Sequence, residues 1–169
     1  FRITVKKDGV YTLTLDDLKS AGLTETSIDT GRIYLYSNST GGRPLDATIG
    51  AAVPSNLIEN TRWIKGNNDQ DFTNADTILF YGRATSGVDV DSKNNLTFVR
   101  NPYSLINYYW LFIADEPGYP KAMPTINSLS ATPNMTVTQS EHLEVHEEEK
   151  VNFLRSGLKW SGEKFNTSG

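Results

Sequence analysis

The stretch Asn107-Tyr-Tyr-Trp-Leu-Phe-Ile-Ala114 decides the fold that we expect of this chain. In an extended strand, alternate side chains point to opposite faces, so both faces of this stretch are apolar or aromatic. One face carries Tyr109, Leu111 and Ile113, and the other carries Tyr108, Trp110 and Phe112. Because neither face is left in water at low cost, we predict a central strand of a sheet that is covered on both sides.

A second apolar, β-prone run, Thr77-Ile-Leu-Phe-Tyr-Gly82, is the nearest candidate partner of this strand. Further β-prone runs recur along the chain, at residues 1–5, 10–15, 32–36, 62–65 and 96–99. Only one short stretch carries helix signals: it follows Thr14 or Asp16 as the N-cap and runs through Leu18 to Ala21. Gly22 supplies the residue that ends this helix. The pattern predicts an all-β protein, a β-sandwich of jelly-roll type with one short α-helix.

The first two strands, residues 1–5 and 10–15, flank the sequence Lys6-Lys-Asp-Gly9. An Asp-Gly pair between two alternating runs is typical of a tight hairpin turn. We therefore expect these two strands to pair with each other.

Three segments follow from the distribution of apolar residues. Residues 1–124 are predicted to form the β-sandwich domain, and residues 125–140, rich in Ser, Thr, Asn and Pro, a linker or long loop. Residues 141–169 are expected to be an extended arm that leads toward a following domain outside this chain. Large aromatic and apolar anchors dominate contacts between domains, so Phe153, Leu154 and Trp160 are the predicted interdomain docking residues.

Composition excludes several classes of function. The net charge of −4 and the absence of a basic stripe argue against nucleic acid as a partner. The chain has no cysteine, which excludes disulfides, thiolate metal sites and a cysteine nucleophile within these residues. The longest apolar run is about seven residues, well below the ~20 that span a bilayer, so we predict no transmembrane segment. Phe1 lies inside an alternating strand, and we expect that a signal peptide once preceded it.

The loop from Asn67 to Asp76 concentrates oxygen ligands. Asp69, Asp71 and Asp76 are its carboxylates, and calcium prefers such oxygen donors in a tight loop, so they are the predicted metal site. The glycine and glutamate that an EF-hand requires are missing at the corresponding positions. The alternative is an Asx-rich turn whose carboxylates accept hydrogen bonds from backbone amides.

Other groups of residues could form functional sites, but each also has an interpretation that requires no function. His142, Glu144 and His146 would share one strand face and could hold zinc, or could simply face solvent in an acidic run. Two carboxylate pairs could serve a glycosidase or be solvated: Asp89 with Asp91, and Asp115 with Glu116. Five aromatic residues could form a sugar-stacking platform or belong to the core: Trp63, Tyr108, Tyr109, Trp110 and Trp160. The Gly-x-Ser-x-Gly and phosphate-binding loop motifs are absent from the sequence.

A series of motifs runs through the chain in a fixed order: Phe1-Arg-Ile-Thr-Val5, Asp8-Gly-Val-Tyr11, Asp71-Phe-Thr-Asn-Ala-Asp-Thr-Ile-Leu-Phe-Tyr-Gly82, Asn101-Pro-Tyr103 and Asn107-Tyr-Tyr109. Together they resemble the non-catalytic N-terminal region of gingipain-type cysteine peptidases. The resemblance is closest to the PorU-like sortases of the type IX secretion system. Trp160-Ser-Gly-Glu163 and the residues just before it resemble the bridge that leads into the next β domain of such proteins.

The resemblance implies an accessory domain of an exported bacterial peptidase, located in the periplasm, the outer membrane or at the cell surface. The family's Cys/His dyad belongs to a later domain, so no catalytic residue is carried over and we do not expect this chain to be an enzyme. The implied partners are the following β domain, the peptidase domain and proteins of the secretion machinery. The alternatives are a carbohydrate-binding module and an inhibitory prodomain of the same peptidase.

Overall fold

The structure of the protein is a computed structural model that describes residues 1–43, 56–66, 69–101, 103–126 and residue 138. Residues Phe1–Asn127 group into one compact unit. The predicted arm, with Phe153, Leu154 and Trp160, lies outside the described residues, as does almost all of the predicted linker. The zinc candidates His142, Glu144 and His146 lie outside them too.

Most of the regular structure in the described residues is β-strand. In chain order the elements are β1 (Arg2–Val5), β2 (Gly9–Thr14), α1 (Leu15–Ser20), β3 (Ile28–Asp29), the 3-10 helix η1 (Thr30–Arg32), β4 (Ile33–Ser37), β5 (Ile58–Asn60), β6 (Trp63–Lys65), β7 (Asp71–Phe72), β8 (Thr77–Gly82), β9 (Gly87–Val90), β10 (Leu96–Val99) and β11 (Asn107–Ile113). The predicted all-β class is thereby confirmed. Within the described part, no helix is long and apolar enough to cross a membrane.

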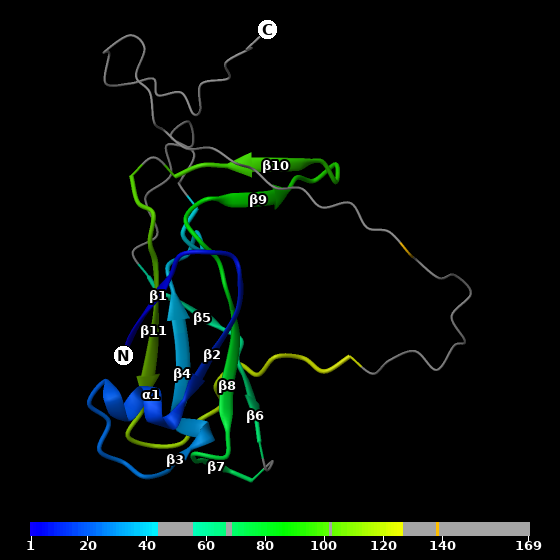
Figure 1. Ribbon diagram of the computed structural model, residues 1–169. Helices are drawn as coiled ribbons and strands as arrows, with labels where there is room; N and C mark the ends of the chain where they lie inside the picture. Colours follow the sequence, from blue (N-terminus) through cyan, green and yellow to red (C-terminus); the bar gives the residue numbers. More distant parts are fainter. Residues whose placement is uncertain (44–55, 67–68, 102, 127–137, 139–169) are drawn as a thin grey trace, which may run out of the picture. The chain divides into compact units, whose positions relative to one another are not determined.

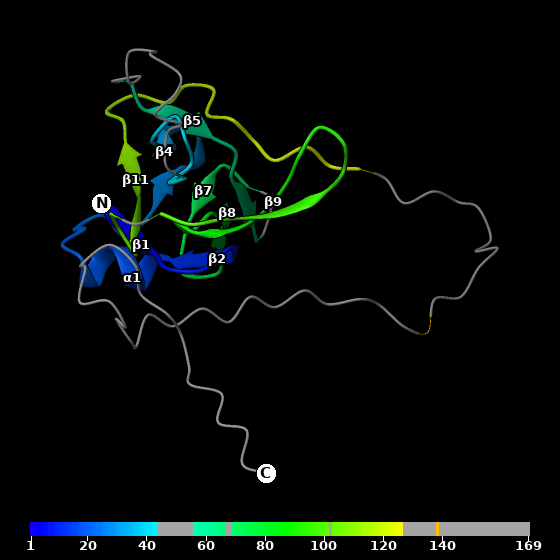
Figure 2. The same cartoon turned by 90° about the horizontal axis from the view of Figure 1, so that it is seen from above.

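The strands form two larger sheets and two short ribbons (Figure 1). The four-stranded sheet has the order β1-β11-β4-β5, and the three-stranded sheet has the order β2-β8-β6. Every pairing between named strands is antiparallel. The view from above shows β1, β11 and β4 on one side and β2 and β8 on the other (Figure 2). The fold is therefore built on two sheets, with β9-β10 and β3-β7 as the ribbons.

One hydrophobic core is shared by the two larger sheets. Its fully or nearly fully buried residues come from both sheets, from α1 and from the β3-β7 ribbon: Val5, Leu15, Leu18, Ile28, Ile33, Leu35, Phe72, Ile78, Phe80, Tyr109 and Leu111. The rings of Phe80 on β8 and Tyr109 on β11 lie 5.3 Å apart between their centroids. The two apolar runs that stood out in the sequence therefore meet across the core as interior strands of two different sheets, and the predicted pairing of residues 77–82 with residues 107–114 is wrong.

The predicted cover on both faces of β11 is wrong for the described part of the chain. Tyr109 and Leu111 are buried in the core, but on the other face Tyr108 and Trp110 are only half-buried and Phe112 is 55% exposed. Tyrosine and tryptophan combine an apolar ring with a polar group, so a row of them is stable at a partly wet surface. β11 is nevertheless an interior strand, paired with β1 and β4.

The predicted hairpin between the first two strands is also wrong. β1 pairs with β11 and β2 pairs with β8, so the chain crosses from one sheet to the other at Lys6–Asp8. The Asp8 carboxylate accepts hydrogen bonds from the backbone N–H of Ala84, at 2.6 Å, and from Arg43 Nη2, at 2.8 Å. These long-range bonds hold the Asp-Gly segment in a crossover, which local turn statistics do not detect.

Of the two predicted N-cap residues, Thr14 caps the helix, whereas Asp16 lies in its first turn. The Thr14 hydroxyl accepts from the backbone N–H of Asp17, and the Asp17 carboxylate accepts from the backbone N–H of Thr14, which is a capping box. Leu15 and Leu18 face the core. Gly22 follows the helix with a φ of 104°, a left-handed conformation that glycine adopts without strain.

Candidate functional site

A cavity of about 280 Å³ opens beside β6, and the three carboxylates that the sequence singled out all line it. Its walls also carry Arg62, Trp63 and Met123. Residues 121–123 run beside Arg62, because Arg62 N–H donates to the Lys121 carbonyl and Met123 N–H donates to the Arg62 carbonyl. The cavity therefore lies between β6, the loop around β7 and the segment that follows β11.

The carboxylates of this cavity take part in local turns. Asp69 Oδ1 accepts from the backbone N–H of Asp71 at 3.2 Å. Asp76 is 3% exposed, and its Oδ2 accepts from both the backbone N–H and the hydroxyl of Thr73 at 2.8 Å. Gly66 makes room for it, since a Cβ there would overlap Asp76 Oδ1. These are bonds of the kind expected of an Asx-rich turn.

The calcium site stays a prediction. Among the residues that the structure describes, no group of three or more His, Cys, Asp or Glu side chains is arranged to hold a metal ion. The three aspartates share one cavity, but the hydrogen bonds made by Asp69 and Asp76 account for their positions without a cation.

Arg62 is the buried side chain of this cavity that the sequence analysis did not single out. It is 7% exposed, its Nε donates to the Ile33 carbonyl at 2.9 Å, and its Nη2 donates to the Thr30 carbonyl at 2.6 Å. Within the described ranges Arg62 has no ion pair, and Nη1 donates no hydrogen bond. Burial lowers the pKa of Arg62, because a charged group is less stable away from water. No local signal in the sequence separates this arginine from a solvated one.

Trp63 forms the aromatic wall of the cavity and is 49% exposed. With Met123, Pro124 and Thr125 it also lines a smaller, more apolar hollow of about 190 Å³. Of the five residues proposed as a sugar-stacking platform, Trp63 lies here, Tyr109 is buried in the core, and Tyr108 and Trp110 lie on the four-stranded sheet. Trp160 lies outside the described residues, and the structure does not bring the other four together as a platform.

A second surface is formed by aromatic side chains on the outer face of the four-stranded sheet. We call it the aromatic face, and it consists of Tyr34, Tyr36, Tyr108, Trp110 and Phe112. The strand register places Arg2, Trp110, Tyr36 and Glu59 in one row across all four strands. The rings of Tyr34 and Tyr36 are nearly parallel, with centroids 6.3 Å apart, and the Arg2 guanidinium carbon lies 4.9 Å from the centroid of the Tyr108 ring.

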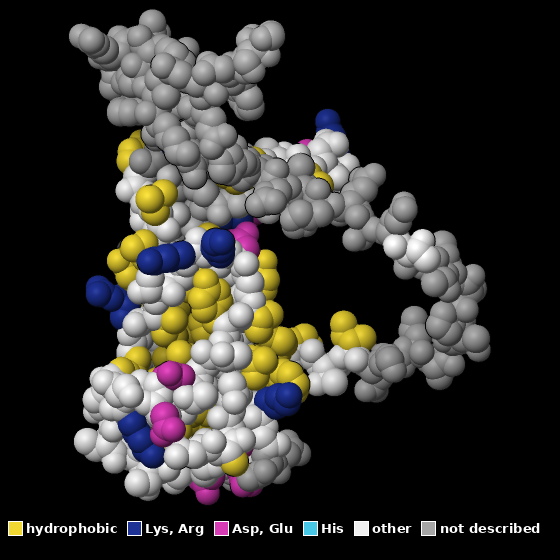
Figure 3. Space-filling model, viewed as in Figure 1, with side chains coloured by type: hydrophobic (Ala, Val, Ile, Leu, Met, Phe, Trp, Pro, Cys, Tyr) yellow, Lys and Arg dark blue, Asp and Glu magenta, His cyan; other side chains and the backbone are white. Residues whose placement is uncertain are grey.

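The outer face of the three-stranded sheet also carries apolar side chains. Val10 is 67% exposed and Tyr81, its partner across the strands, is 54% exposed. Hydrophobic side chains are visible over β2 and β8 (Figure 3). Trp63 lies on the same sheet, opposite Leu79, and links this surface to the cavity.

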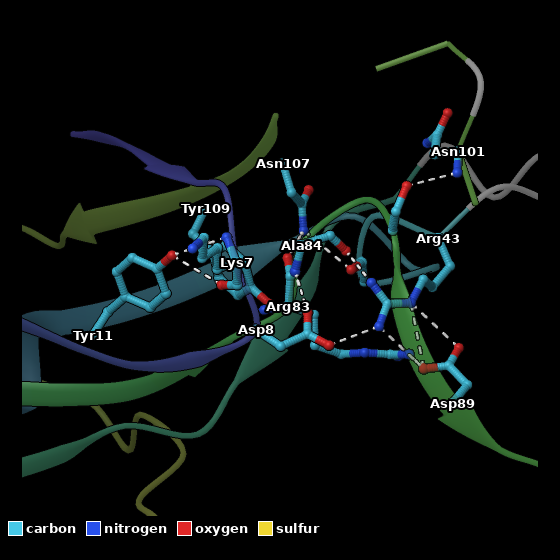
Figure 4. A network of polar contacts seen from close by, with 12 residues as sticks. Lys7, Asp8, Tyr11, Arg43, Arg83, Ala84, Asp89, Asn101, Asn107 and Tyr109 are labelled. Carbon is cyan, nitrogen blue, oxygen red and sulfur yellow. Dashed lines mark hydrogen bonds and ion pairs between the residues drawn. The ribbon is translucent and has the colours of Figure 1, made fainter. Parts of the chain in front are cut away.

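A network of ion pairs and hydrogen bonds joins the ends of several strands (Figure 4). Arg43 is 7% exposed and pairs with Asp8 at 2.8 Å and Asp89 at 3.2 Å, while its Nη1 donates to the Ala84 carbonyl at 2.6 Å. Arg83 also pairs with Asp89, at 2.7 Å. The network fixes the crossover after β1 to the turn between β8 and β9.

The glycosidase candidates do not have the environment of a general acid. Burial alone would raise the pKa of Asp89, but the hydrogen bonds and charges of Arg43 and Arg83 outweigh it and hold that pKa below its usual range. Hydrogen bonds from Asn95 and Lys93 lower the pKa of Asp91. A catalytic acid requires a raised pKa, so neither group matches that role. Asp115 and Glu116 are both exposed.

Comparisons of the chain were made with protein-family models, with curated proteins and with solved structures. None of the three finds a match for this chain.

Proposed function

We propose that this chain is a non-catalytic accessory domain of a larger, exported, gingipain-like cysteine peptidase, and that it docks on a neighbouring domain of that peptidase through the aromatic face. The ordered motifs that resemble the N-terminal region of PorU-like sortases support the family and an extracytoplasmic location. The two sheets around one core support a sandwich, for which the jelly-roll connection remains part of the proposal.

The observation that carries the docking role is the aromatic face. Tyrosine, tryptophan, phenylalanine and arginine are enriched at the centres of protein interfaces and supply most of their binding energy. Here Phe112 is 55% exposed, and the row that contains Trp110 and Tyr36 ends in Arg2 and Glu59. A partner that covers this face would bury aromatic rings at the centre and meet charged groups at the rim.

The aromatic face is held rigidly before any partner arrives. Tyr109 and Leu111 anchor the opposite side of β11 in the core, and Ile33 and Leu35 do the same for β4. The Tyr109 hydroxyl accepts a hydrogen bond from the backbone N–H of Arg83 at 3.0 Å. Because the strands are already ordered, docking loses little conformational entropy, which favours affinity.

The test uses calorimetry to measure binding of this chain to the following β domain of the parent protein. In one format the two domains are separate molecules, and in the other they are joined in one chain. We expect saturable binding that Phe112→Ser weakens at least about tenfold, in the range of an interface hot spot. Val10→Ser is the matched control, since Val10 is exposed on the other sheet. Equal binding by wild type and Phe112→Ser, or no association in either format, would refute the docking role.

The same mixture separates docking from inhibition. Peptidase turnover that is unchanged by micromolar amounts of this chain agrees with a docking domain. Strong inhibition at that concentration would favour the inhibitory prodomain instead.

A further inference from the structure

The cavity beside β6 carries charges of both signs that do not neutralise each other by direct pairing. Asp69, Asp71 and Asp76 line it together with Arg62, and within the described part no carboxylate lies within ion-pair distance of the Arg62 guanidinium. An anionic ligand would be repelled by three carboxylates, whereas a simple cation would be attracted to them, so cations are tested below as competing ligands. A neutral ligand with both hydrogen-bond donors and acceptors can bond to the carboxylates as well as to the guanidinium.

Arg62 lines the cavity, and its guanidinium is held in one orientation. Two of its nitrogens are held by the backbone carbonyls of Ile33 and Thr30, so the planar guanidinium has a fixed orientation. Nη1 is the nitrogen that makes no hydrogen bond to a described residue. Asp69 and Asp71 are exposed, and a carboxylate has about four acceptor positions, so their oxygens can accept from several hydroxyl groups at once.

Trp63 supplies the apolar surface that a sugar ring requires. Trp63 is 49% exposed and lines the cavity together with Met123. A sugar ring has an apolar C–H face, which packs on an aromatic ring, and a rim of hydroxyl groups, which need donors and acceptors. The cavity volume of about 280 Å³ corresponds to roughly nine water molecules, which gives room for a single ring.

We infer that the cavity beside β6 binds one neutral sugar residue of a glycan, which stacks on Trp63 and is hydrogen-bonded by Arg62, Asp69 and Asp71. The site lies on the three-stranded sheet, whereas the aromatic face belongs to the four-stranded sheet. The inference is therefore independent of the docking role and adds a ligand of defined chemistry to it.

The experiment titrates the full chain with neutral oligosaccharides of glucose, xylose, mannose and N-acetylglucosamine, by calorimetry and by tryptophan fluorescence. We expect saturable binding to at least one of them, with a Kd in the millimolar range or below. Trp63→Ala and Asp71→Asn should each weaken it at least about tenfold, which corresponds to about 1.4 kcal/mol. Trp63→Phe should restore much of the affinity, because it keeps a ring for stacking.

Two control variants change similar groups outside the cavity. Tyr103→Ala removes an aromatic ring that is 91% exposed, and Asp91→Asn changes an exposed carboxylate in the turn before β10. Both should bind sugar as the wild type does. Phe112→Ser should also leave sugar binding unchanged, so failure of this inference is distinguishable from failure of the docking role.

Three results would overturn the inference. The first is the absence of saturable binding to every sugar of the panel at millimolar concentration. The second is sugar binding that neither Trp63→Ala nor Asp71→Asn affects. The third is saturable binding of calcium chloride or of an alkylamine, abolished by Asp71→Asn, with no sugar binding, which would assign the cavity to a cation.

Discussion

Replacing Arg43 with methionine tests whether the buried ion-pair network stabilises the fold. The side chain of Arg43 is 7% exposed and makes charged hydrogen bonds to Asp8 and Asp89 and one to the Ala84 carbonyl. Methionine keeps much of the apolar stem and removes the guanidinium. Two carboxylates and one carbonyl then lose their common donor in a partly buried place.

The size of the effect follows from the burial of the partners. Removing one member of a fully buried ion pair typically costs about 3–5 kcal/mol. The side chains of Asp8 and Asp89 are 27% and 31% exposed, so water can replace part of the lost interaction. We therefore expect a loss of about 2–3 kcal/mol in the free energy of unfolding. For a unit the size of Phe1–Asn127, this corresponds to a decrease of roughly 7–11 °C in Tm.

Urea unfolding followed by tryptophan fluorescence, with a thermal scan by circular dichroism, measures this loss. Arg32→Met is the comparator, because it removes a similar pair with Glu25 at a more exposed position and should shift the midpoint much less. Adding Asp89→Asn to Arg43→Met should cost less than Asp89→Asn alone, because the two residues interact directly. A loss below about 1 kcal/mol in Arg43→Met, or additive single effects, would refute a stabilising network.

Three further perturbations follow from single contacts. Thr14→Ala removes the N-cap hydroxyl of α1 and should lower the free energy of unfolding by about 1 kcal/mol in urea, whereas an unchanged midpoint would contradict a role for the cap. Gly66→Ala places a methyl group against Asp76 Oδ1, and we expect a destabilisation of about 1–3 kcal/mol; a variant as stable as the wild type would show that the carboxylate moves freely. Because the pKa of Asp89 is lowered in the folded protein, its contribution is present above the unfolded value of about 4 and is lost as the pH falls through the folded value. Between neutral and strongly acidic pH, the free energy of unfolding of Asp89→Asn should therefore fall less than that of the wild type. Equal decreases in the two proteins, measured by urea titration, would contradict a stabilising role of the Asp89 carboxylate.

The positions of the central strands and of the helix cap could be predicted because their signals are local. A continuous run of apolar and aromatic residues is enough to indicate that residues 107–113 form a strand, and burial of Tyr109 and Leu111 shows which face is the inner one. The threonine that precedes α1 is similarly a local signal, since it bonds the amide three residues later. Neither inference requires knowledge of what lies across the core.

Pairing partners could not be predicted, because they depend on contacts that are distant in the sequence. Asp8-Gly9 resembles a hairpin turn, but the Asp8 carboxylate is bound by Ala84 and Arg43, which lie 76 and 35 residues away. The network instead favours a crossover between sheets. Whether a strand face is covered also depends on segments that are distant in the sequence. The outer face of β11 was expected to be covered, but Phe112 on that face is exposed.

The candidate site shows the same division between local and distant signals. The cluster of aspartates within a short loop can be recognised in the sequence, and Asp69, Asp71 and Asp76 do line one cavity. Arg62 carries no such mark, because its burial is produced by the carbonyl groups of Thr30 and Ile33 and by the segment that ends at Met123. The acidic loop alone indicates a cation, whereas Arg62 and Trp63 in the same cavity favour a ligand that also accepts hydrogen bonds and has an apolar face.

The two proposed surfaces make different demands on the fold, and this explains why both can exist on one small body. The aromatic face needs only that β11 and β4 be held in register, which the pairing of Trp110 with Tyr36 and the core contact of Tyr109 provide. The cavity needs the buried guanidinium of Arg62, the residue before β6, which the backbone carbonyls of η1 and β4 stabilise by accepting its hydrogen bonds. Since the two share no side chain, a substitution such as Phe112→Ser or Trp63→Ala removes one surface while the core that supports the other stays intact.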